Sequence, residues 1–445
     1  MMKSKLYFAS IVALAVASAC HGQEHKIGLQ EAIDLAVSQN HAVKMARYEV
    51  AAEQEKKRIA YSDYFPSITN ESNAIHITNL ERIEVPPGAF GQVPGGPLIP
   101  SATTYLTQGN LDYQTSGTML AQPITQLIKI HDSNKIAEAD LKTSEASERK
   151  TITDIVYKVQ ELYYRVLTTQ LQRKAAELQI TSSEESLAEA REQNKHGELL
   201  EVALVESRAN SLEAKQTLLS TEMTISTLTT QLNDALGLPL NTNLDLDPDV
   251  NTTVDVPARD EALRIALTNN PEVQEAIQKV AKARAATGAA KAEYIPDVTG
   301  FARYSYQNGV PFVDHNFGTF GVRFTYDLFD AGKRRSLIHE RQDEVSEAEE
   351  NLKRVKDEIA VRITTIYNRL ETTRTMIDVS KESLAARQEN ARLTENQFKE
   401  GVSLASQRDA AHAQAMKAQA GLLETNLDYL LTRDELMQVL GASAK

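Results

Sequence analysis

The sequence has no tryptophan, a single cysteine and few aromatic residues, which make up 6% of its 445 positions. One cysteine excludes an internal disulfide, so no covalent cross-link within the chain supports the fold. Behind the N-terminal segment there is no run of about 18 apolar residues, which excludes a spanning helix and leaves a closed β-barrel as the only way to cross a membrane. Basic residues number 48 against 61 acidic ones, and the net charge of -13 excludes the electrostatic footprint of a nucleic-acid-binding protein.

The signatures of catalysis and of cofactor binding are also missing. No phosphate-binding Gly-Lys-Ser/Thr loop occurs, so we expect no nucleotide hydrolysis and infer that energy comes from a partner. The nine histidines are dispersed and form no zinc-binding pattern. We therefore expect no metal, no cofactor and no enzymatic activity, because no set of base, nucleophile or metal ligands is present.

The N-terminal residues 1–19 have the pattern of a secretory signal peptide. Lys3 and Lys5 precede an apolar run over 6–16, and the small residues Ala-Ser-Ala follow it. Cys20 stands directly behind this run, where a bacterial lipoprotein is cleaved and acylated. The mature chain is expected to start near Cys20, either as a lipoprotein or after ordinary cleavage.

The mature chain contains two copies of one unit. Residues 31–40 match residues 261–270, and the same offset of 230 places 64–69 on 294–299 without a gap. Further along the chain the offset is 204, and it holds to the C-terminal end. Self-similarity of this kind predicts two structurally equivalent halves.

The two copies define the expected domain organisation. The first repeat covers 20–240, a polar linker covers 241–258, and the second repeat covers 259–445. The difference of 26 residues between the two offsets is an insertion in the first copy. Residues 86–100 contain five prolines and four glycines, so we expect an exposed loop without regular structure over about 83–101.

Long helices are predicted where proline is absent. The tracts 127–195 and 331–399 each give a helix of roughly 70 residues, on the order of 100 Å long. Shorter companions are expected at about 31–63 and 202–237. Apolar residues recur every three or four positions, which is typical of coiled-coil packing. In the first long tract they include Ile152, Ile155, Val159, Leu162 and Val166.

Extended segments are predicted between the short and the long helices. Pro66 and Pro296 open these segments, because a helix must stop before such a residue. Strands are expected at about 66–80, 108–123, 296–308 and 317–328. The last of these alternates clearly, and the side chains expected to face lipid are Phe320, Val322, Phe324 and Tyr326. Four strands cannot close a barrel, so several copies of the chain must share one.

These features follow one another in this order in both copies, and with them the sequence resembles the TolC-like outer-membrane efflux protein family. The resemblance covers about residues 27–441 and rests on short motifs. They are the repeated Glu-Ala-(Ile/Leu)-x-x-Ala-x-x-x-Asn opening, the Tyr-x-Pro switch, the segment from Tyr326 to Arg334 and the closing Leu-Gly. The resemblance implies a mainly α fold with a small β part. Long antiparallel coiled-coil helices then form a trimeric α-barrel, and four strands per chain contribute to a 12-stranded transmembrane β-barrel.

The function that the resemblance implies is that of an outer-membrane channel in a tripartite efflux or type I secretion system. A homotrimer in outer-membrane lipid extends into the periplasm and passively conducts solutes from an inner-membrane pump and a periplasmic adaptor. The expected contacts with the adaptor are His196, Gly197, Glu400 and Gly401, at the breaks between long and short helices. Related tips often have valine where this chain has His196 and Glu400.

The lower end of the channel differs from that of the family's namesake. There, aspartates stand six and nine positions after the second tip glycine, whereas this chain has Gln407 and Ala410. Candidate residues of an acidic constriction are Glu201, Glu206, Gln407 and Asp409. The alternative is that these are ordinary solvated charges on a helix surface.

The main alternative function is a periplasmic coiled-coil scaffold or adaptor without a pore. Such a protein shares the helices but does not need a strand with Phe320, Val322 and Phe324 on a lipid-facing side. An adaptor also needs compact β domains, for which the sequence gives no sign.

Overall fold

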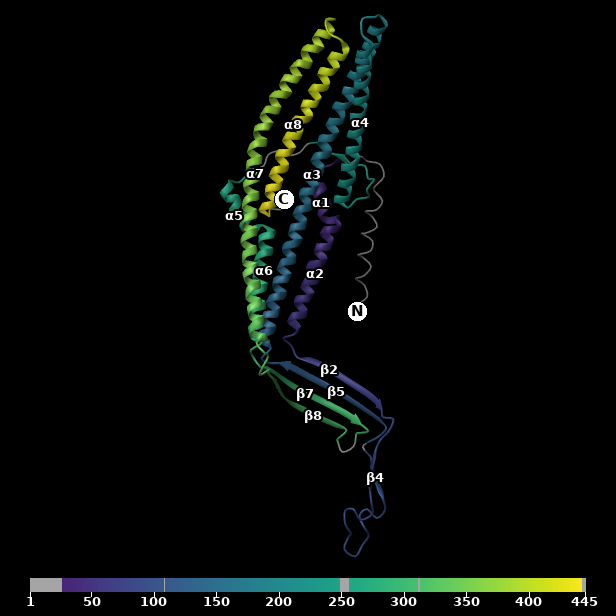
Figure 1. Cartoon of the computed structure of the whole chain (residues 1–445), viewed down its shortest axis with the longest axis vertical. Coiled ribbons are helices and arrows are strands. Elements are labelled where there is room, and N and C mark those ends of the chain that lie inside the picture. Colours follow the sequence, from purple (N-terminus) through teal and green to yellow (C-terminus); the bar gives the residue numbers. More distant parts are fainter. Residues whose placement is uncertain (1–25, 108, 249–255, 311–312, 442–445) are drawn as a thin grey trace, which may run out of the picture. The chain divides into compact units, whose positions relative to one another are not determined.

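The computed structural model describes residues 26–107, 109–248, 256–310 and 313–441. Helices make up most of the described chain, and the strands are few (Figure 1). The prediction of a mainly α fold with a small β part is therefore confirmed. The expected signal peptide and Cys20 lie outside the described residues, as does the middle of the expected linker.

Two long helices and two shorter ones follow the predicted tracts. Helix α3 spans Leu127–Lys195 and α7 spans Lys333–Lys399, with α4 at Glu201–Leu236 and α8 at Ala405–Leu440. No proline interrupts any of these helices. The apolar spacing becomes a buried stripe, which on α7 consists of Val355, Ile359, Ile363, Ile366 and Leu370.

The helix expected at 31–63 is broken in two. Helix α1 spans Leu29–Gln39 and α2 spans His41–Ser62, with Asn40 between them in a non-helical conformation. The Asn40 side chain accepts a hydrogen bond from the Ala42 amide at 2.8 Å and donates one to the Ala235 carbonyl at 3.0 Å. The Asn40 side chain thus supplies the acceptor that the Ala42 amide lacks at the start of α2. The apolar periodicity does not reveal this break between the two helices.

The second repeat has the same break. Helix α5 spans Arg259–Asn269 and α6 spans Pro271–Ala292, and Asn270 separates them. The Asn270 side chain accepts a hydrogen bond from the Glu272 amide at 2.8 Å and donates one to the Val439 carbonyl at 2.8 Å. Asn40 and Asn270 therefore perform one structural role in the two copies.

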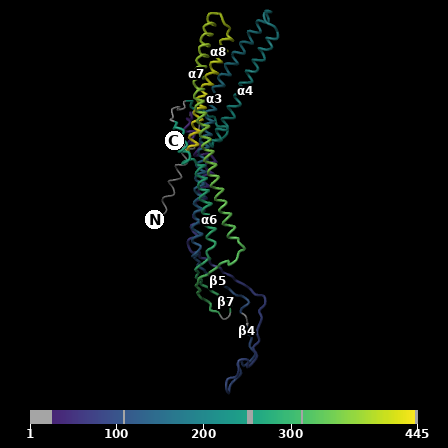
Figure 2. The backbone as a smooth tube through the Cα atoms, turned by 60° about the vertical axis from the view of Figure 1, so that its left-hand side comes forward, coloured from purple at the N-terminus to yellow at the C-terminus, as the bar shows by residue number. Residues whose placement is uncertain are grey.

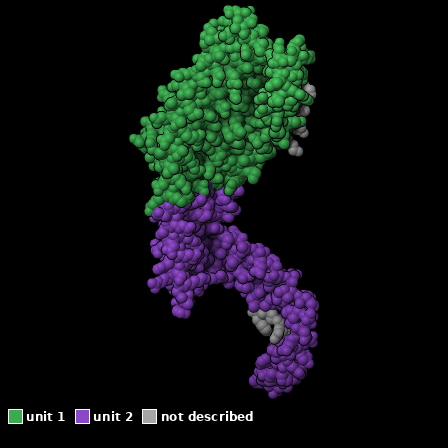
Figure 3. Space-filling model, turned by 45° about the horizontal axis from the view of Figure 1, so that its top comes forward, with its two compact units in different colours: residues 1–50, 144–276, 352–445 green, residues 51–143, 277–351 purple. Residues whose placement is uncertain are grey.

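The chain folds into two compact units (Figure 3). Unit 1 takes residues 1–50, 144–276 and 352–445, and unit 2 takes residues 51–143 and 277–351. Each unit contains segments from both sequence repeats. Neither unit corresponds to a single repeat.

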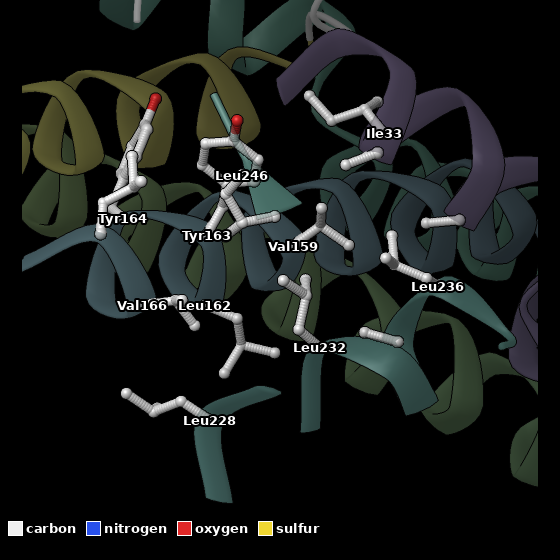
Figure 4. Packing of buried hydrophobic residues seen from close by; sticks show 14 of the residues in the cluster. Ile33, Val159, Leu162, Tyr163, Tyr164, Val166, Leu228, Leu232, Leu236 and Leu246 are labelled. Carbon is white, nitrogen blue, oxygen red and sulfur yellow. The ribbon is translucent and has the colours of Figure 1, made fainter. Parts of the chain in front are cut away.

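The core of unit 1 surrounds Tyr163, whose side chain is fully buried (Figure 4). Its hydroxyl oxygen lies 2.9 Å from the Ile27 carbonyl and 2.8 Å from the Asp247 carbonyl, and the two carbonyls share its single proton. These carbonyls belong to a short parallel pair of strands, β1 (Lys26–Ile27) and β6 (Asp245–Leu246), together with the residue that follows β6. The expected linker therefore contains a strand, which its polar sequence does not predict.

Unit 2 contains an antiparallel sheet in the order β2-β5-β7-β8. The strands span Ser67–His76, Asp112–Pro123, Asp297–Asn308 and Asn316–Thr325. Strands β5 and β7 lie side by side, so the hairpins of the two repeats form one sheet. Strands β2 and β8 are its edges, each paired with one neighbour among the described residues.

The loop expected to be irregular over 83–101 begins with a regular strand. Strands β3 (Arg82–Val85) and β4 (Thr104–Thr107) form a separate antiparallel hairpin, in which Ile83 lies opposite Leu106. The prediction was wrong for 83–85, because apolar residues alternate with charged ones just before the prolines. The remaining residues of the loop connect the two strands.

Candidate functional site

Two tight turns connect the long helices of unit 1 to the short ones, and both lie at the same end of that unit (Figures 1 and 2). Gly197 and Gly401 adopt φ values of 75° and 71°, in the left-handed region that favours glycine. The Glu198 amide donates to the Gln193 carbonyl at 2.9 Å, and the matching bond in the second turn is 2.8 Å long. This pattern closes a helix and reverses the chain.

The residues predicted at the tip all lie on the surface. His196 and Glu400 precede the two glycines and are exposed. Sequence reasoning missed the apolar side chains that follow the glycines. Leu200 is 79% exposed, and Val202 and Val402 are exposed to a similar degree. Exposed apolar residues within five positions after each glycine are the signal that could have identified them.

Asp409, predicted to line a constriction, lies in a charged cluster that joins α8 to α3. The Arg408 Nε atom is 2.6 Å from Asp409 Oδ1, and the Arg408 guanidinium is 3.8 Å from Glu185 Oε1. The same guanidinium lies over the Phe398 ring, 4.4 Å from its centroid. Nearby, the Ser182 hydroxyl of α3 donates to the Ser406 carbonyl of α8 at 3.1 Å.

The carboxyl groups of Glu185 and Asp409 interact directly. The hydrogen bond to Asp409, together with burial, raises the pKa of Glu185. The Arg408 guanidinium is the main cause that lowers the pKa of Asp409. A proton shared by the pair therefore resides on Glu185, which donates to Asp409. Without that proton, the Oε2 atom of Glu185 is buried and has no hydrogen-bond partner.

The other predicted constriction residues are not part of this cluster. Glu201 and Glu206 are exposed on α4, and Gln407 is exposed on α8. The Gln407 side chain accepts a hydrogen bond from the Leu404 amide at 3.3 Å, which places it at the start of α8. Only Asp409 of the four contacts the opposite helix α3, and it does so through Glu185.

The sheet of unit 2 has one apolar face. Its register places Phe320 opposite Ala302, Ala302 opposite Leu120, and Leu120 opposite Ile68. Directly paired residues share a face, so a row of apolar side chains crosses all four strands. Val322 and Phe324 lie on the same face of β8 and are exposed, as is Phe320, whose side chain is 89% accessible.

Polar residues of the first repeat interrupt this face, but they bond to one another. The Asn70 amide of β2 donates to the Thr118 hydroxyl of β5 at 2.9 Å. The hydroxyls of Ser72 and Ser116 form a second bond of 2.9 Å between the same strands. Pairing of this kind reduces the cost of placing these groups in apolar surroundings, because their hydrogen-bonding capacity is partly used.

The opposite face of the sheet carries charge. Arg303 lies on this face, and its side chain extends across Gly117 of β5, where a Cβ atom would be 2.5 Å from a guanidinium nitrogen. Arg323 lies over the Phe301 ring at 5.8 Å on the same side. An apolar face and a charged face are what a wall between lipid and water requires.

The two proline switches stand where the strands begin. Strand β2 starts directly after Pro66, and β7 starts directly after Pro296. The Thr125 hydroxyl, which sequence reasoning missed, donates to the Pro296 carbonyl at 2.7 Å and accepts from the Val298 amide at 2.8 Å. It thus ties the start of α3 to the start of β7, and no local pattern around Thr125 indicates this long-range contact.

Tyr326 does not lie on the strand to which its alternation assigned it. Strand β8 ends at Thr325, and the Tyr326 ring packs against the Arg334 guanidinium at 5.1 Å. The same guanidinium lies 5.2 Å from the Tyr294 ring and forms an ion pair with Asp330 at 2.7 Å. Cation–π packing and this ion pair stabilise the turn between β8 and α7. These contacts explain why the motif from Tyr326 to Arg334 contains Tyr326, Asp330 and Arg334.

Residues 26–107, 109–248, 256–310 and 313–441 contain neither a membrane-spanning helix nor a metal-binding cluster. No helix in these ranges combines the length and the apolar character needed to cross a membrane. No group of three or more histidine, cysteine, aspartate or glutamate side chains in the same ranges is placed to hold a metal ion.

Solved structures of several outer-membrane proteins share this fold. The VceC protein of Vibrio cholerae has 14% sequence identity, with 93% of this chain and 96% of that chain covered and a TM-score of 0.72. The MtrE outer membrane channel of Neisseria gonorrhoeae has 16% identity, with 93% and 89% covered and a TM-score of 0.71. The CmeC outer membrane channel of Campylobacter jejuni has 15% identity, with 93% and 85% covered and a TM-score of 0.71.

Comparison with curated protein sequences gives no match. The family described as outer membrane efflux protein matches residues 32–237 and 262–442, with one match on each side of the expected linker. These two segments make up most of the chain and include the helical turns and the sheet. We conclude from this match that the chain belongs to the outer membrane efflux protein family.

Proposed function

We propose that three copies of this chain form one channel through which solutes leave the cell across the outer membrane. An inner-membrane pump supplies the energy and the choice of solute, and a periplasmic adaptor joins the pump to the channel. The chain itself acts passively, through the shape of its assembled wall.

The observation that carries this proposal is the open sheet of unit 2. Its edge strands β2 and β8 each have a free side among the described residues, and one of its faces is apolar. Unpaired backbone groups cannot remain in lipid, so the two edges must pair with other strands. Edge β8 of one copy can pair with edge β2 of the next, and three four-stranded sheets then close as a barrel of 3 × 4 = 12 strands.

The helices of unit 1 support the same assembly. Apolar side chains remain exposed on α4, including Leu219 and Met223, and on α7, including Met376 and Val379. Met376 and Val379 line an open, shallow depression on the exposed side of α7. Long helices with uncovered apolar stripes need further helices against them, and another copy of the chain supplies these.

The turns at Gly197 and Gly401 are the surfaces we assign to the adaptor. Leu200, Val202 and Val402 expose apolar groups there, and exposed apolar groups at one end of a helical structure are typical of a protein contact. His196 and Glu400 add polar groups beside them. The cluster around Arg408 holds α3 and α8 together behind this surface.

The test is the native mass of the protein after detergent extraction from isolated outer membranes. A mass of three chains, together with ion conductance in planar bilayers, is the expected result. Release without detergent, or a mass of one chain, overturns the channel. That result favours instead a periplasmic coiled-coil scaffold, which needs no lipid-facing strand.

A further inference from the structure

The insertion in the first repeat folds into a defined loop. We call residues 86–103, between strands β3 and β4, the proline loop. Its backbone forms hydrogen bonds across the loop, from the Phe90 amide to the Ile99 carbonyl at 2.9 Å and from the Ile99 amide to the Gly91 carbonyl at 2.8 Å. The Gly88 amide donates to the Pro100 carbonyl at 3.0 Å. The second repeat has no counterpart of this insertion.

The surface of the proline loop is apolar and uncharged. No Asp, Glu, Lys, Arg or His occurs in the 27 residues from Val85 to Leu111, although charged residues make up 24% of the chain. Phe90 is 71% exposed, and the other exposed apolar side chains of the loop are Val93, Leu98 and Ile99. An ordered, uncharged and apolar projection on a protein this rich in charge indicates a buried contact in the assembly.

Lipid does not suit this surface. The loop contains five prolines, which cannot donate backbone hydrogen bonds, and outside the short hairpin its backbone is irregular. Irregular backbone is not tolerated in the hydrocarbon region, because its carbonyl and amide groups lack partners there. A protein surface can provide both apolar contact and hydrogen bonds, so the occupant is a protein.

The position of the loop in the sheet selects which protein. The hairpin of β3 and β4 directly follows β2, the edge strand that pairs with the next copy in the proposed channel. The loop therefore leaves the sheet at the border between two copies, at the end of the strands remote from the helices (Figure 1). Every copy brings the same uncharged surface to this border, so no repulsion between like charges opposes contact.

We propose that the proline loop packs against the neighbouring copy of this chain and extends the contact between copies beyond the paired edge strands. The inference rests on the proposed channel. It assigns the apolar side chains around Phe90 to a contact between chains, with a second copy as the occupant.

The test places the photoreactive p-benzoylphenylalanine at position 90 in the full chain. The change is small, because the native side chain is also a phenyl ring on the surface. After irradiation of the protein in native outer membranes, we expect a covalent product with the mass of two chains. Dilution of the detergent-extracted protein before irradiation should leave its yield unchanged, since the contact is within one assembly.

The matched control places the same group at position 320, on the apolar face of β8, where we expect attachment to lipid. Attachment of lipid at position 90, attachment of a different protein, or no product there overturns the inference. If the native mass is three chains and position 320 labels lipid, such a result leaves the channel standing. A native mass of one chain overturns the channel itself, so the two failures are distinguishable.

Discussion

A single hydroxyl group holds together three segments that are far apart in the sequence. Tyr163 of α3 donates to the carbonyls of Ile27 and Asp247, and both carbonyls lie in the core of unit 1 or at its border. Burial raises the pKa of Tyr163 to about 12, and the nearby Asp247 adds to this effect. The hydroxyl therefore stays protonated, and stays a donor, at every pH that the protein meets.

We expect Tyr163→Phe to lower the stability of the assembled protein by about 1–2 kcal/mol, because two backbone carbonyls lose their donor while the ring still fills its space. Thermal unfolding of the detergent-extracted protein measures this effect. Tyr48→Phe is the control, because Tyr48 is exposed on α2 and its change should cost almost nothing. Equal melting temperatures for the two variants contradict the role of the Tyr163 hydroxyl.

The pair of Glu185 and Asp409 makes the contact between α3 and α8 sensitive to pH. The pKa of Glu185 is raised above its usual 4.5, so its protonated form is favoured in the folded protein. The contribution of this group is fully present below the usual pKa and is lost as the pH rises through the raised value. Above that value both groups are charged, and Arg408 offsets part of their repulsion.

We therefore expect the distance between spin labels on α3 and α8 near Glu185 to increase as the pH rises from below the usual value of 4.5 through the raised pKa of Glu185. Glu185→Gln should abolish the dependence, because an amide donates to Asp409 at every pH. Glu184→Gln is the control, since the Glu184 side chain is directed to Lys215 at 2.7 Å instead. A pH dependence that persists in Glu185→Gln shows that another group is responsible.

At the scale of elements, the two helical turns depend on glycine for backbone reasons alone. A Cβ atom at Gly401 meets nothing within 4 Å, so only its φ of 71° resists another residue. Gly401→Ala should cost about 1–2 kcal/mol, the penalty of a left-handed conformation. Gly421→Ala, inside α8 and also free of close contacts, should instead stabilise by about 0.5–1 kcal/mol. Denaturant unfolding of both variants shows whether each substitution raises or lowers the free energy of unfolding. A stabilising Gly401→Ala refutes the argument.

The elements differ in how far they could be predicted. Helices α3 and α7 were predictable because proline is absent and an apolar stripe runs along them. The breaks at Asn40 and Asn270 were not predictable, because a helix of this composition continues unless a side chain bonds to a carbonyl far away in the sequence. Here the two asparagine side chains donate to the carbonyls of Ala235 and Val439. Strand β6 in the linker was missed for the same reason, since two residues of strand exist only through their pairing with β1.

At the scale of the whole molecule, assembly depends on the apolar face of the sheet. Phe324→Asp places a charge on this face and should lower the amount of assembled protein in the outer membrane, at a cost of about 1–2 kcal/mol per chain. Native electrophoresis of membrane extracts measures the assembled fraction. Wild-type accumulation of this variant contradicts a lipid-facing position for Phe324.

The control for this prediction is Thr319→Asp on the same strand. Thr319 lies on the charged face, directly opposite Arg303 of β7, so a carboxylate there gains a cation as its neighbour. We expect this variant to assemble as well as wild type. Both variants introduce an aspartate into β8, but on opposite faces of the sheet. A difference in their assembly therefore comes from the face that carries the charge and not from the added charge itself.

The sequence by itself determined the class of fold, the places of the long helices, the turn glycines and the starts of β2 and β7, because proline, glycine and apolar spacing act locally. It also placed Phe320, Val322 and Phe324 on one strand face. Only the tertiary structure decided that the hairpins of the two repeats pair through β5 and β7. It also decided that Asp409 contacts α3, and that Tyr326 packs against Arg334 instead of lying on β8. These outcomes depend on contacts between residues far apart in the chain, whose geometry local patterns do not encode.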